Sequence, residues 1–377
     1  MHVGLNLIFL VPREMSGLET YARELTRALL EETSDLRITA FVNREASADA
    51  GWRELASTVT VPVYGRRRAS WVRGEQFLLP RLAREAGVDV LHSLASTAPS
   101  RGAFARVVTI HDVIYRIHPE AHGWRTLALR GLIPLAARRS HRVIAPSHST
   151  KSDLVSLLEV PAEKIDVVPN GIGTPPLATW ATEEDVRLRY DLGGRPFVLT
   201  VSLKRPNKNL ERLLEALALI PSERRPFLLL AGHATPYQER LRAHAVRLGV
   251  ADDARFLDWV PNEELESVYR AAIAFVFPSL YEGFGLPVLE AMSRGVPVAC
   301  SNRGALAEVA DDAALTFDPE QPRAIAAAIE KLISDPSERT RLARAGRENA
   351  ARFSWSETAR GTLASYKSAL AYSRRTT

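Results

Sequence analysis

Short apolar runs alternate with amphipathic segments along the chain, and this alternation restricts the possible folds more than any other feature. Runs with the length and composition of buried strands occur at residues 3–10, 36–42, 88–92, 107–111, 142–147, 197–202, 227–232, 255–260 and 275–277. Between them, segments such as residues 18–30 and 237–248 repeat apolar residues at helical spacing. Strands that alternate with helices of these lengths predict parallel sheets with helices on both faces.

The length of the chain and one turn predict two such sheets. A chain of 377 residues exceeds the size of one typical domain. Pro169-Asn170-Gly171 is a turn signal, and Pro175 and Pro176 stiffen the segment that follows. We predict an α/β protein with two Rossmann-like doubly wound domains, over residues 1–172 and 173–354, and a last helix over 355–377.

The composition of the chain limits the kinds of binding partner and the cellular compartment that can be expected. The net charge of +5 favours anionic partners, but no basic motif interleaved with aromatic residues indicates nucleic acid. The single cysteine, Cys300, cannot form an internal disulfide, which fits a cytoplasmic protein. No run approaches about twenty apolar residues, so we expect no transmembrane helix. We expect no metal site either, because clusters of Cys and His are absent from the sequence.

One stretch combines a buried strand, a glycine loop and a helix start, and it reads FVFPSLYEGFGLPVLEAMSRGVPVAC over residues 275–300. Free N–H groups in such a loop, at the positive end of a helix, favour an anion. Glu282 and Glu290 bracket the loop, and carboxylates accept hydrogen bonds from diols. The stretch therefore indicates a sugar nucleotide, with the alternative that the glycines only close turns.

Three other positions carry candidate site residues. Lys204, Arg205 and Lys208 follow the strand at 197–202, where cations can neutralise a diphosphate or form a solvated turn. His111 ends the strand at 107–111, at the sheet edge where open α/β proteins bind ligands, although a lone histidine there can be purely structural. Ser16-Gly17 precedes a helix after the first strand, as a ligand loop or a plain turn would.

The spacing of Glu282 and Glu290, together with GFGLPVLEAM and GVPVACSNRGALAEV, resembles the signature of the retaining glycosyltransferases of family 4, which have the GT-B architecture. The resemblance implies two Rossmann-like domains that face each other across a cleft. The N-terminal domain would bind the acceptor and the C-terminal domain the nucleotide-sugar donor. The last helix would cross back to the N-terminal domain.

The resemblance also implies a role for each candidate residue. Glu282 would hold hexose hydroxyls, Glu290 the ribose, and His111 would lie near the donor sugar. The residues that would hold the diphosphate are Lys208, Arg205 or Lys204, the loop of Gly283, Phe284, Gly285 and Leu286, and the facing loop of Ser16 and Gly17; Val260 would contact the base. The sequence departs from the family at Ser202-Leu203, where the family often has Gly-Arg. Either Arg205 or Lys204 takes that role, or the second cation is missing.

The reaction implied is transfer of a hexose with retention, without a cofactor or metal. TIHDV, VPNG and PNKNL are similar to bacterial mannosyltransferases of polysaccharide assembly, which implies GDP-mannose as donor and a saccharide or lipid-linked acceptor. A sugar-nucleotide epimerase, a glycogen-synthase-like polymerising enzyme and a non-catalytic sugar-nucleotide sensor remain alternatives. Arginines at 66–68 with Trp71 are compatible with peripheral contact to an anionic membrane or a phosphorylated acceptor, or with a solvated loop whose tryptophan packs back.

Overall fold

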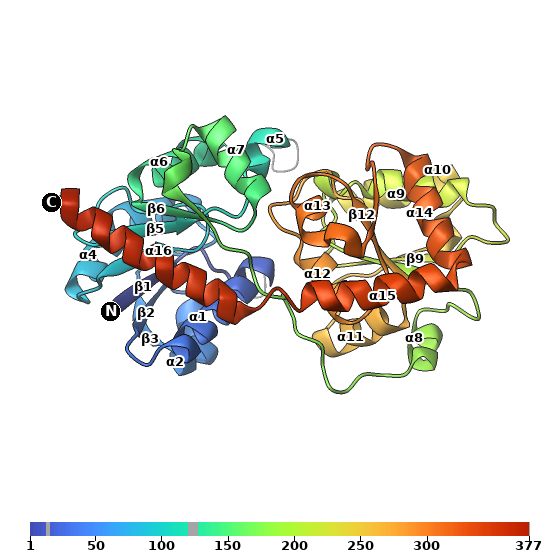
Figure 1. Cartoon of the computed structure of the whole chain (residues 1–377), viewed down its shortest axis with the longest axis horizontal. Helices are drawn as coiled ribbons and strands as arrows, with labels where there is room; N and C mark the ends of the chain where they lie inside the picture. Colours follow the sequence, from blue (N-terminus) through green and yellow to red (C-terminus); the bar gives the residue numbers. More distant parts are fainter. Residues whose placement is uncertain (13–15, 120–126, 377) are drawn as a thin grey trace. The chain divides into compact units, whose positions relative to one another are not determined.

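The computed structural model describes residues 1–12, 16–119 and 127–376, and these form two compact units (Figure 1). Unit 1 comprises Met1–Gly171 and Ser354–Thr377, and unit 2 comprises Ile172–Phe353. The chain therefore leaves unit 1 after its first segment and returns to it with its last helix.

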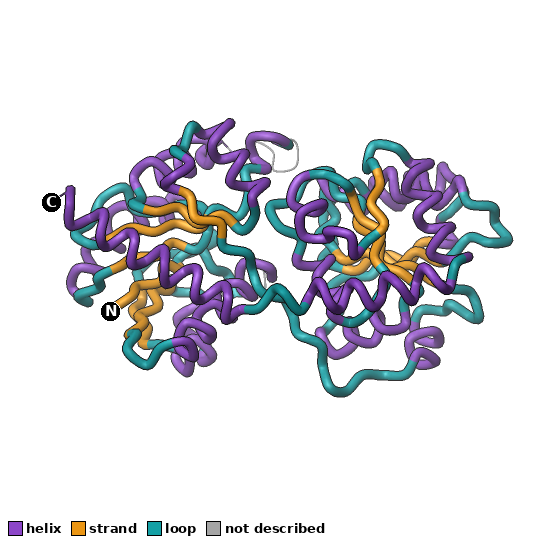
Figure 2. The backbone as a smooth tube through the Cα atoms, in the orientation of Figure 1, coloured by secondary structure: helices purple, strands orange, loops and turns teal. Residues whose placement is uncertain are grey.

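Unit 1 is built on a seven-stranded parallel sheet with the order β3-β2-β1-β4-β5-β6-β7 (Figure 2). Its strands are β1 (His2–Leu7), β2 (Arg37–Val42), β3 (Ser57–Thr60), β4 (Val90–Ser93), β5 (Ala105–Thr109), β6 (Arg142–Ala145) and β7 (Ile165–Val167). In register, Val3 lies beside Ile38 on one side and Val90 on the other. All six residues of β1 are buried, as expected for a central parallel strand that is covered on both faces.

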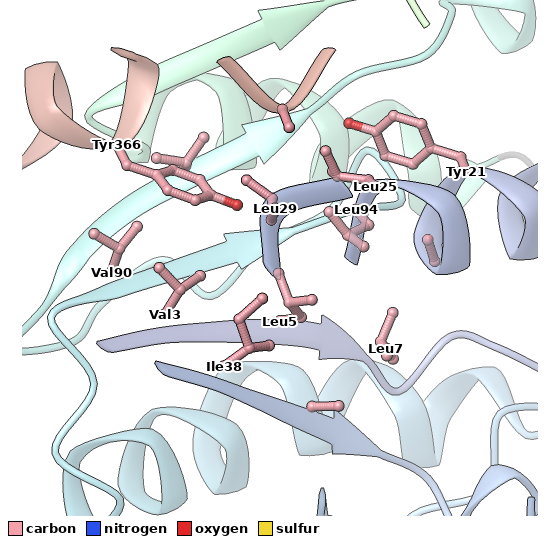
Figure 3. Packing of buried hydrophobic residues seen from close by; sticks show 14 of the residues in the cluster. Val3, Leu5, Leu7, Tyr21, Leu25, Leu29, Ile38, Val90, Leu94 and Tyr366 are labelled. Carbon is pink, nitrogen blue, oxygen red and sulfur yellow. The ribbon is translucent and has the colours of Figure 1, made fainter. Parts of the chain in front are cut away.

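Helices cover both faces of this sheet. They are α1 (Ser16–Glu32), α2 (Ala50–Leu55), α3 (Arg68–Arg73), α4 (Leu79–Glu85), α5 (Ile114–Ile117), α6 (Leu127–Arg139), α7 (His148–Leu158) and α16 (Trp355–Thr376), with short turns η1 (Ala46–Ala48), η2 (Gly74–Leu78) and η5 (Ala162–Lys164). Helix α16 packs on α1 and β5. Figure 3 shows Tyr366 of α16 in one apolar cluster with Val3, Leu5 and Leu29.

Unit 2 is built on a six-stranded parallel sheet with the order β10-β9-β8-β11-β12-β13. Its strands are β8 (Phe197–Val201), β9 (Phe227–Ala231), β10 (Ala254–Phe256), β11 (Ala274–Phe277), β12 (Val298–Ser301) and β13 (Leu315–Phe317). Its helices are α8 (Glu183–Arg189), α9 (Leu210–Leu219), α10 (Tyr237–Leu248), α11 (Asn262–Ala271), α12 (Leu286–Ser293), α13 (Gly304–Ala310), α14 (Pro322–Ser334) and α15 (Pro336–Ala350), with turns η6 (Pro206–Lys208), η7 (Ala251–Asp253) and η8 (Asp311–Ala313). Two apolar clusters fill the two faces of this sheet.

The predicted α/β class with two Rossmann-like parallel sheets is confirmed. Several predicted strands were too long. The largest differences are at β1, which ends at Leu7 and not at residue 10, and at β10, which ends at Phe256 before residues 257–260 continue as a loop into α11. Helices α8 and α13 were not predicted. The helix expected over 124–139 corresponds to α6, Leu127–Arg139, and residues 124–126 lie outside the described part.

Candidate active site

The strand order of unit 2 reverses between β8 and β11, and this reversal marks where a ligand is expected. From β8 the chain moves outward to β9 and β10, and from β11 it moves the other way to β12 and β13. The loops after β8 and β11 therefore leave adjacent strands in opposite directions. Open α/β sheets bind ligands outside the carboxyl ends of their strands at such a point. The two loops carry Lys208 and Glu282.

Backbone hydrogen bonds join these two loops. The carbonyl of Asn207 accepts from the backbone N–H of Leu280 at 2.9 Å and from the Ser279 hydroxyl at 3.0 Å. Asn209 has a left-handed backbone with φ of 58°, a conformation that asparagine tolerates well. Its amide donates to the carbonyl of Pro278 at 3.1 Å. The residues before and after Lys208 are therefore both held in place by hydrogen bonds.

Lys208 and Glu282 form an ion pair at this point. Lys208 Nζ lies 2.5 Å from Glu282 Oε1, and the side chains are only 17% and 16% exposed. The ammonium group also lies 5.6 Å from the ring centre of Phe277. A cation suited to phosphate and a carboxylate suited to hydroxyl groups thus lie side by side at the switch point.

The loop before α12 presents backbone rather than side chains. Gly285 has φ of 131°, and a Cβ there would meet Leu306 Cδ2 at 2.8 Å, so only glycine fits. The first N–H groups of the following helix have no acceptor within the helix and lie at its positive end. The side chain of Phe284 is buried with its ring centre 5.8 Å from that of Phe353, and Val260 is buried too. Phe284 can therefore serve a ligand only through its backbone.

Glu290, on α12, is held by two groups of unit 2. Its Oε1 accepts from the backbone N–H of Thr174 at 2.9 Å, and its Oε2 accepts from the Tyr269 hydroxyl at 3.2 Å. Burial raises the pKa of the Glu290 carboxyl, while the Thr174 N–H, Arg294 and the Tyr269 hydroxyl act in the opposite direction. Each carboxylate oxygen has more than one acceptor direction, so Glu290 can also receive hydrogen bonds from a ligand.

A buried ion pair lies behind Glu290. Glu266 is buried and accepts from Arg294 at 2.8 Å and from Arg270 at 2.6 Å. Arg294 also donates to the carbonyls of Glu290 at 2.9 Å and of Thr174 at 3.2 Å. These contacts fix the segment that approaches Glu290 from the start of unit 2.

Replacing Tyr269 with phenylalanine is expected to destabilise the protein by about 1–2 kcal/mol, because Glu290 loses a hydrogen bond in a buried setting. Unfolding by urea, followed by circular dichroism, measures the change. Tyr64→Phe is the matched control, since the Tyr64 side chain is exposed. Equal stability of Tyr269→Phe and Tyr64→Phe would mean that the Tyr269 hydroxyl does not support Glu290.

The two other predicted cations occupy different environments. Lys204 is fully buried, and its ammonium group donates to the carbonyls of Gly232 and Leu257. A buried group with these contacts does not present its charge to a diphosphate, so we leave Lys204 out of the ligand contacts. Arg205 is partly exposed immediately before η6 and stays a predicted contact.

His111 lies in unit 1, after β5. Its Nε2–H donates to the carbonyl of Leu94 at 2.8 Å, and its ring meets that of Tyr21 edge-on at 4.7 Å. Burial lowers the pKa of His111, so the neutral ring, with Nδ1 as its acceptor, is favoured. Asp112 accepts from the N–H of Ile114 at 3.0 Å and so fixes the loop that follows.

The N-terminal loop is described only in part. Gly17 is exposed in the first turn of α1. Ser16 is the first residue of that helix, but its side chain lies outside the described part, as do residues 13–15. Trp71 packs against two apolar clusters of unit 1, which is the packed-back arrangement considered above.

Sequence reasoning missed Glu75, a buried carboxyl group in unit 1. Glu75 lies in the π-helical turn η2 and accepts from Asn6 at 2.9 Å and from Thr97 at 2.9 Å. Its neighbour Gln76 donates to the carbonyl of Ala98 at 3.0 Å. Glu75 and Gln76 thereby tie the loop after β4 to β1. Burial raises the pKa of Glu75 to about 7, although the hydrogen bonds to its carboxylate act to lower the pKa.

This pKa predicts a pH effect on stability. Between the ordinary value of 4.5 and about 7, folded protein holds a proton on Glu75 that unfolded protein has lost, so this group's contribution to stability falls as pH rises through that window. Glu75→Gln cannot ionise. Its free energy of unfolding, relative to wild type, should therefore rise by about 1–3 kcal/mol between pH 4 and pH 8.

Urea unfolding across this pH range measures the difference. Glu54→Gln, at an exposed position of unit 1, should show no such trend. A difference between Glu75→Gln and wild type that stays constant with pH would contradict the assignment.

Comparisons with known proteins identify the family of the chain. Residues 185–349 match the family described as glycosyl transferases group 1, and residues 15–174 match the family described as glycosyltransferase family 4. The chain is 30% identical to O-antigen chain mannosyltransferase B of Escherichia coli over 368 residues, covering 94% of this chain and 96% of the relative. It is 32% identical to D-inositol 3-phosphate glycosyltransferase of Acidothermus cellulolyticus, covering 77% and 70%.

Solved structures share the fold. A sucrose-phosphate synthase from Thermosynechococcus elongatus superposes with a TM-score of 0.78 at 21% identity, covering 97% of this chain and 98% of the other. HepE of Anabaena, in complex with UDP and glucose, gives a TM-score of 0.76 at 18% identity, with coverage of 97% and 100%. Within the described residues, no helix has the length and apolar character needed to cross a bilayer.

Proposed function

The chain belongs to family 4 of the glycosyltransferases, and on this premise we propose that it moves a hexose from a nucleoside-diphosphate sugar to an acceptor hydroxyl, with retention at the anomeric carbon. The observation that carries the proposal is the Lys208–Glu282 pair at the strand-order reversal of unit 2. A phosphate and a sugar hydroxyl group on one ligand would satisfy this pair together.

Each residue of the site has a part in this proposal. Lys208, with Arg205 and the N–H groups of the loop at 283–286, binds the diphosphate. Charge on the leaving diphosphate grows as the glycosidic bond breaks, so a fixed cation favours the transition state over the bound substrate. Glu282 binds hexose hydroxyls and Glu290 the ribose. The fixed cation gives the leaving group a counter-charge that requires no metal ion.

The acceptor side of the proposal rests on unit 1. Contacts with Leu94 and Tyr21 fix the ring of His111, and burial lowers its pKa and so favours the neutral ring, which suits a group that accepts a hydrogen bond from a hydroxyl. Retention would follow a same-face path in which a phosphate oxygen of the leaving group helps to remove the proton of the acceptor. We propose a saccharide or lipid-linked acceptor in polysaccharide assembly.

Mannose is the proposed donor sugar and GDP the proposed carrier. The support is the similarity over nearly the full length to a mannosyltransferase of O-antigen assembly. D-inositol 3-phosphate glycosyltransferases also match, so the sugar needs a direct test.

A panel of nucleotide sugars tests the function. Purified protein is mixed with GDP-mannose, UDP-glucose, UDP-N-acetylglucosamine and ADP-glucose, with and without EDTA, and thermal stability and slow donor hydrolysis are measured. We expect GDP-mannose to give the largest effects, unchanged by EDTA. No stabilisation and no hydrolysis with any donor would reject the proposal. Stabilisation without hydrolysis or transfer would favour a sugar-nucleotide sensor, and an altered nucleotide sugar would reveal an epimerase.

A further inference from the structure

Lys204 ties together three loops at the sheet edge that carries the candidate site. It follows β8, and its buried ammonium group donates to the carbonyl of Gly232, after β9, and to that of Leu257, after β10. Its own carbonyl accepts from the hydroxyl of Thr235. One side chain thus joins the segments that leave three strands.

These three strands are neighbours in the order β10-β9-β8, and their carboxyl ends share one edge. The loop after β8 continues to Lys208, and the loop after β10 continues to Val260. The backbone of the middle loop approaches closely, because a Cβ on Gly232 would meet the carbonyl oxygen of Ser202 at 2.3 Å. The N–H of Gly232 also donates to the carbonyl of Asp258 at 3.2 Å. The distance between the loop after β8 and the loop after β10 is therefore set by contacts with the loop after β9, which lies between them.

A lysine at this position would lower the stability of the fold if its side chain served only to fill space. The ammonium group donates to two carbonyls, and the carboxylate of Asp258 acts on it through its charge. Burial lowers the pKa of Lys204 to about 8, with Arg242 acting in the same direction and Asp258 against it. A buried charge with only carbonyl partners destabilises the fold relative to an apolar side chain. What the ammonium group adds is a directional link between loops.

We propose that Lys204 is a positioning residue for the nucleotide: it does not touch the donor, but it sets the distance between the loop that binds the diphosphate and the loop that contacts the base. The inference rests on the proposed function. It also distinguishes Lys204 from Lys208, which contacts the donor directly.

Lys204→Met tests the inference, because methionine keeps an unbranched chain and removes both hydrogen bonds. We expect the donor KM to rise by about tenfold or more, since two charge-assisted hydrogen bonds are lost. The acceptor KM should stay within about twofold. The melting temperature should change little, because removal of the buried charge offsets the loss of a donor to the carbonyls of Gly232 and Leu257. Lys331→Met, at an exposed position of α14, is the control and should match wild type in all three.

Calorimetry with the nucleoside diphosphate alone separates failure of this inference from failure of the proposed function. If wild type binds no nucleotide, the proposed function and the inference fall together. If wild type binds and Lys204→Met binds equally well, only the inference is overturned. A lower melting temperature with unchanged donor KM would also overturn it, because the role would then be purely structural. Lys204→Gln retains an N–H donor and should show an intermediate donor KM. If Lys204→Met does not fold, Lys204→Gln is compared with wild type in its place.

Discussion

Lys208→Ala is expected to lower the turnover number by about 10²–10³-fold, the effect of removing one preorganised group that stabilises developing charge. We expect this effect because of where Lys208 lies. Lys208 lies on a loop whose backbone is held by hydrogen bonds at the strand-order reversal of unit 2, so its ammonium group has only to exchange its contact with Glu282 for the leaving diphosphate. Steady-state kinetics with saturating donor measure the change.

Two controls make the result specific. Lys331→Ala removes a lysine at an exposed position of the same unit and should retain the wild-type rate. Lys208→Arg keeps a cation but not the compact ammonium group, and we expect it to recover part of the lost turnover. Lys208→Ala also leaves Glu282 without its ion-pair partner, so urea unfolding must show that the variant is folded. A folded Lys208→Ala protein with the wild-type rate would contradict the assigned role.

Glu290→Ala is expected to weaken nucleotide binding by about 10- to 100-fold, since a hydrogen bond to a charged group contributes about 1.5–3 kcal/mol and 1.4 kcal/mol is tenfold. Turnover at saturating donor should change less, because the ribose is remote from the reacting bond. Isothermal calorimetry with the nucleoside diphosphate measures the affinity.

The same substitution removes the acceptor of the Thr174 N–H and the Tyr269 hydroxyl, so some loss of stability accompanies it. Glu290→Gln keeps one acceptor oxygen and should bind the nucleotide with intermediate affinity. Glu184→Ala, at an exposed position of α8, controls for loss of an acidic side chain. Unchanged affinity in Glu290→Ala would show that Glu290 only stabilises α12 and its neighbours.

The sheets could be predicted because buried parallel strands are nearly continuous apolar runs. Residues 275–277, for example, lie within β11, whose four residues are all buried. The end of β10 could not be predicted in this way. Residues 257–260 have a mixed apolar and polar sequence, and only their contacts with neighbouring loops, such as Gly232 N–H to Asp258, show that they have left the sheet.

In the candidate site, too, some features could be predicted from the sequence and others are shown only by the structure. Lys208 and Glu282 were both selected from the sequence, but nothing in their local sequence shows that they form an ion pair. Lys204 and Lys208 belong to one basic turn in the sequence, yet one is buried against carbonyls and the other pairs with a carboxylate. Tyr269 carries no sequence signal for its contact with Glu290, because it lies on a different helix. Chemistry within one segment could be predicted, whereas contacts between segments required the structure.

A crystal structure with the bound nucleotide sugar tests the central claim most directly. The account predicts the diphosphate within about 3.2 Å of Lys208 Nζ and of N–H groups in the loop at 283–286, and ribose hydroxyls on Glu290. It also predicts that Glu282 Oε1 gives up its contact with Lys208 to a hexose hydroxyl. A nucleotide bound elsewhere on unit 2, with the Lys208–Glu282 pair intact, would contradict the account.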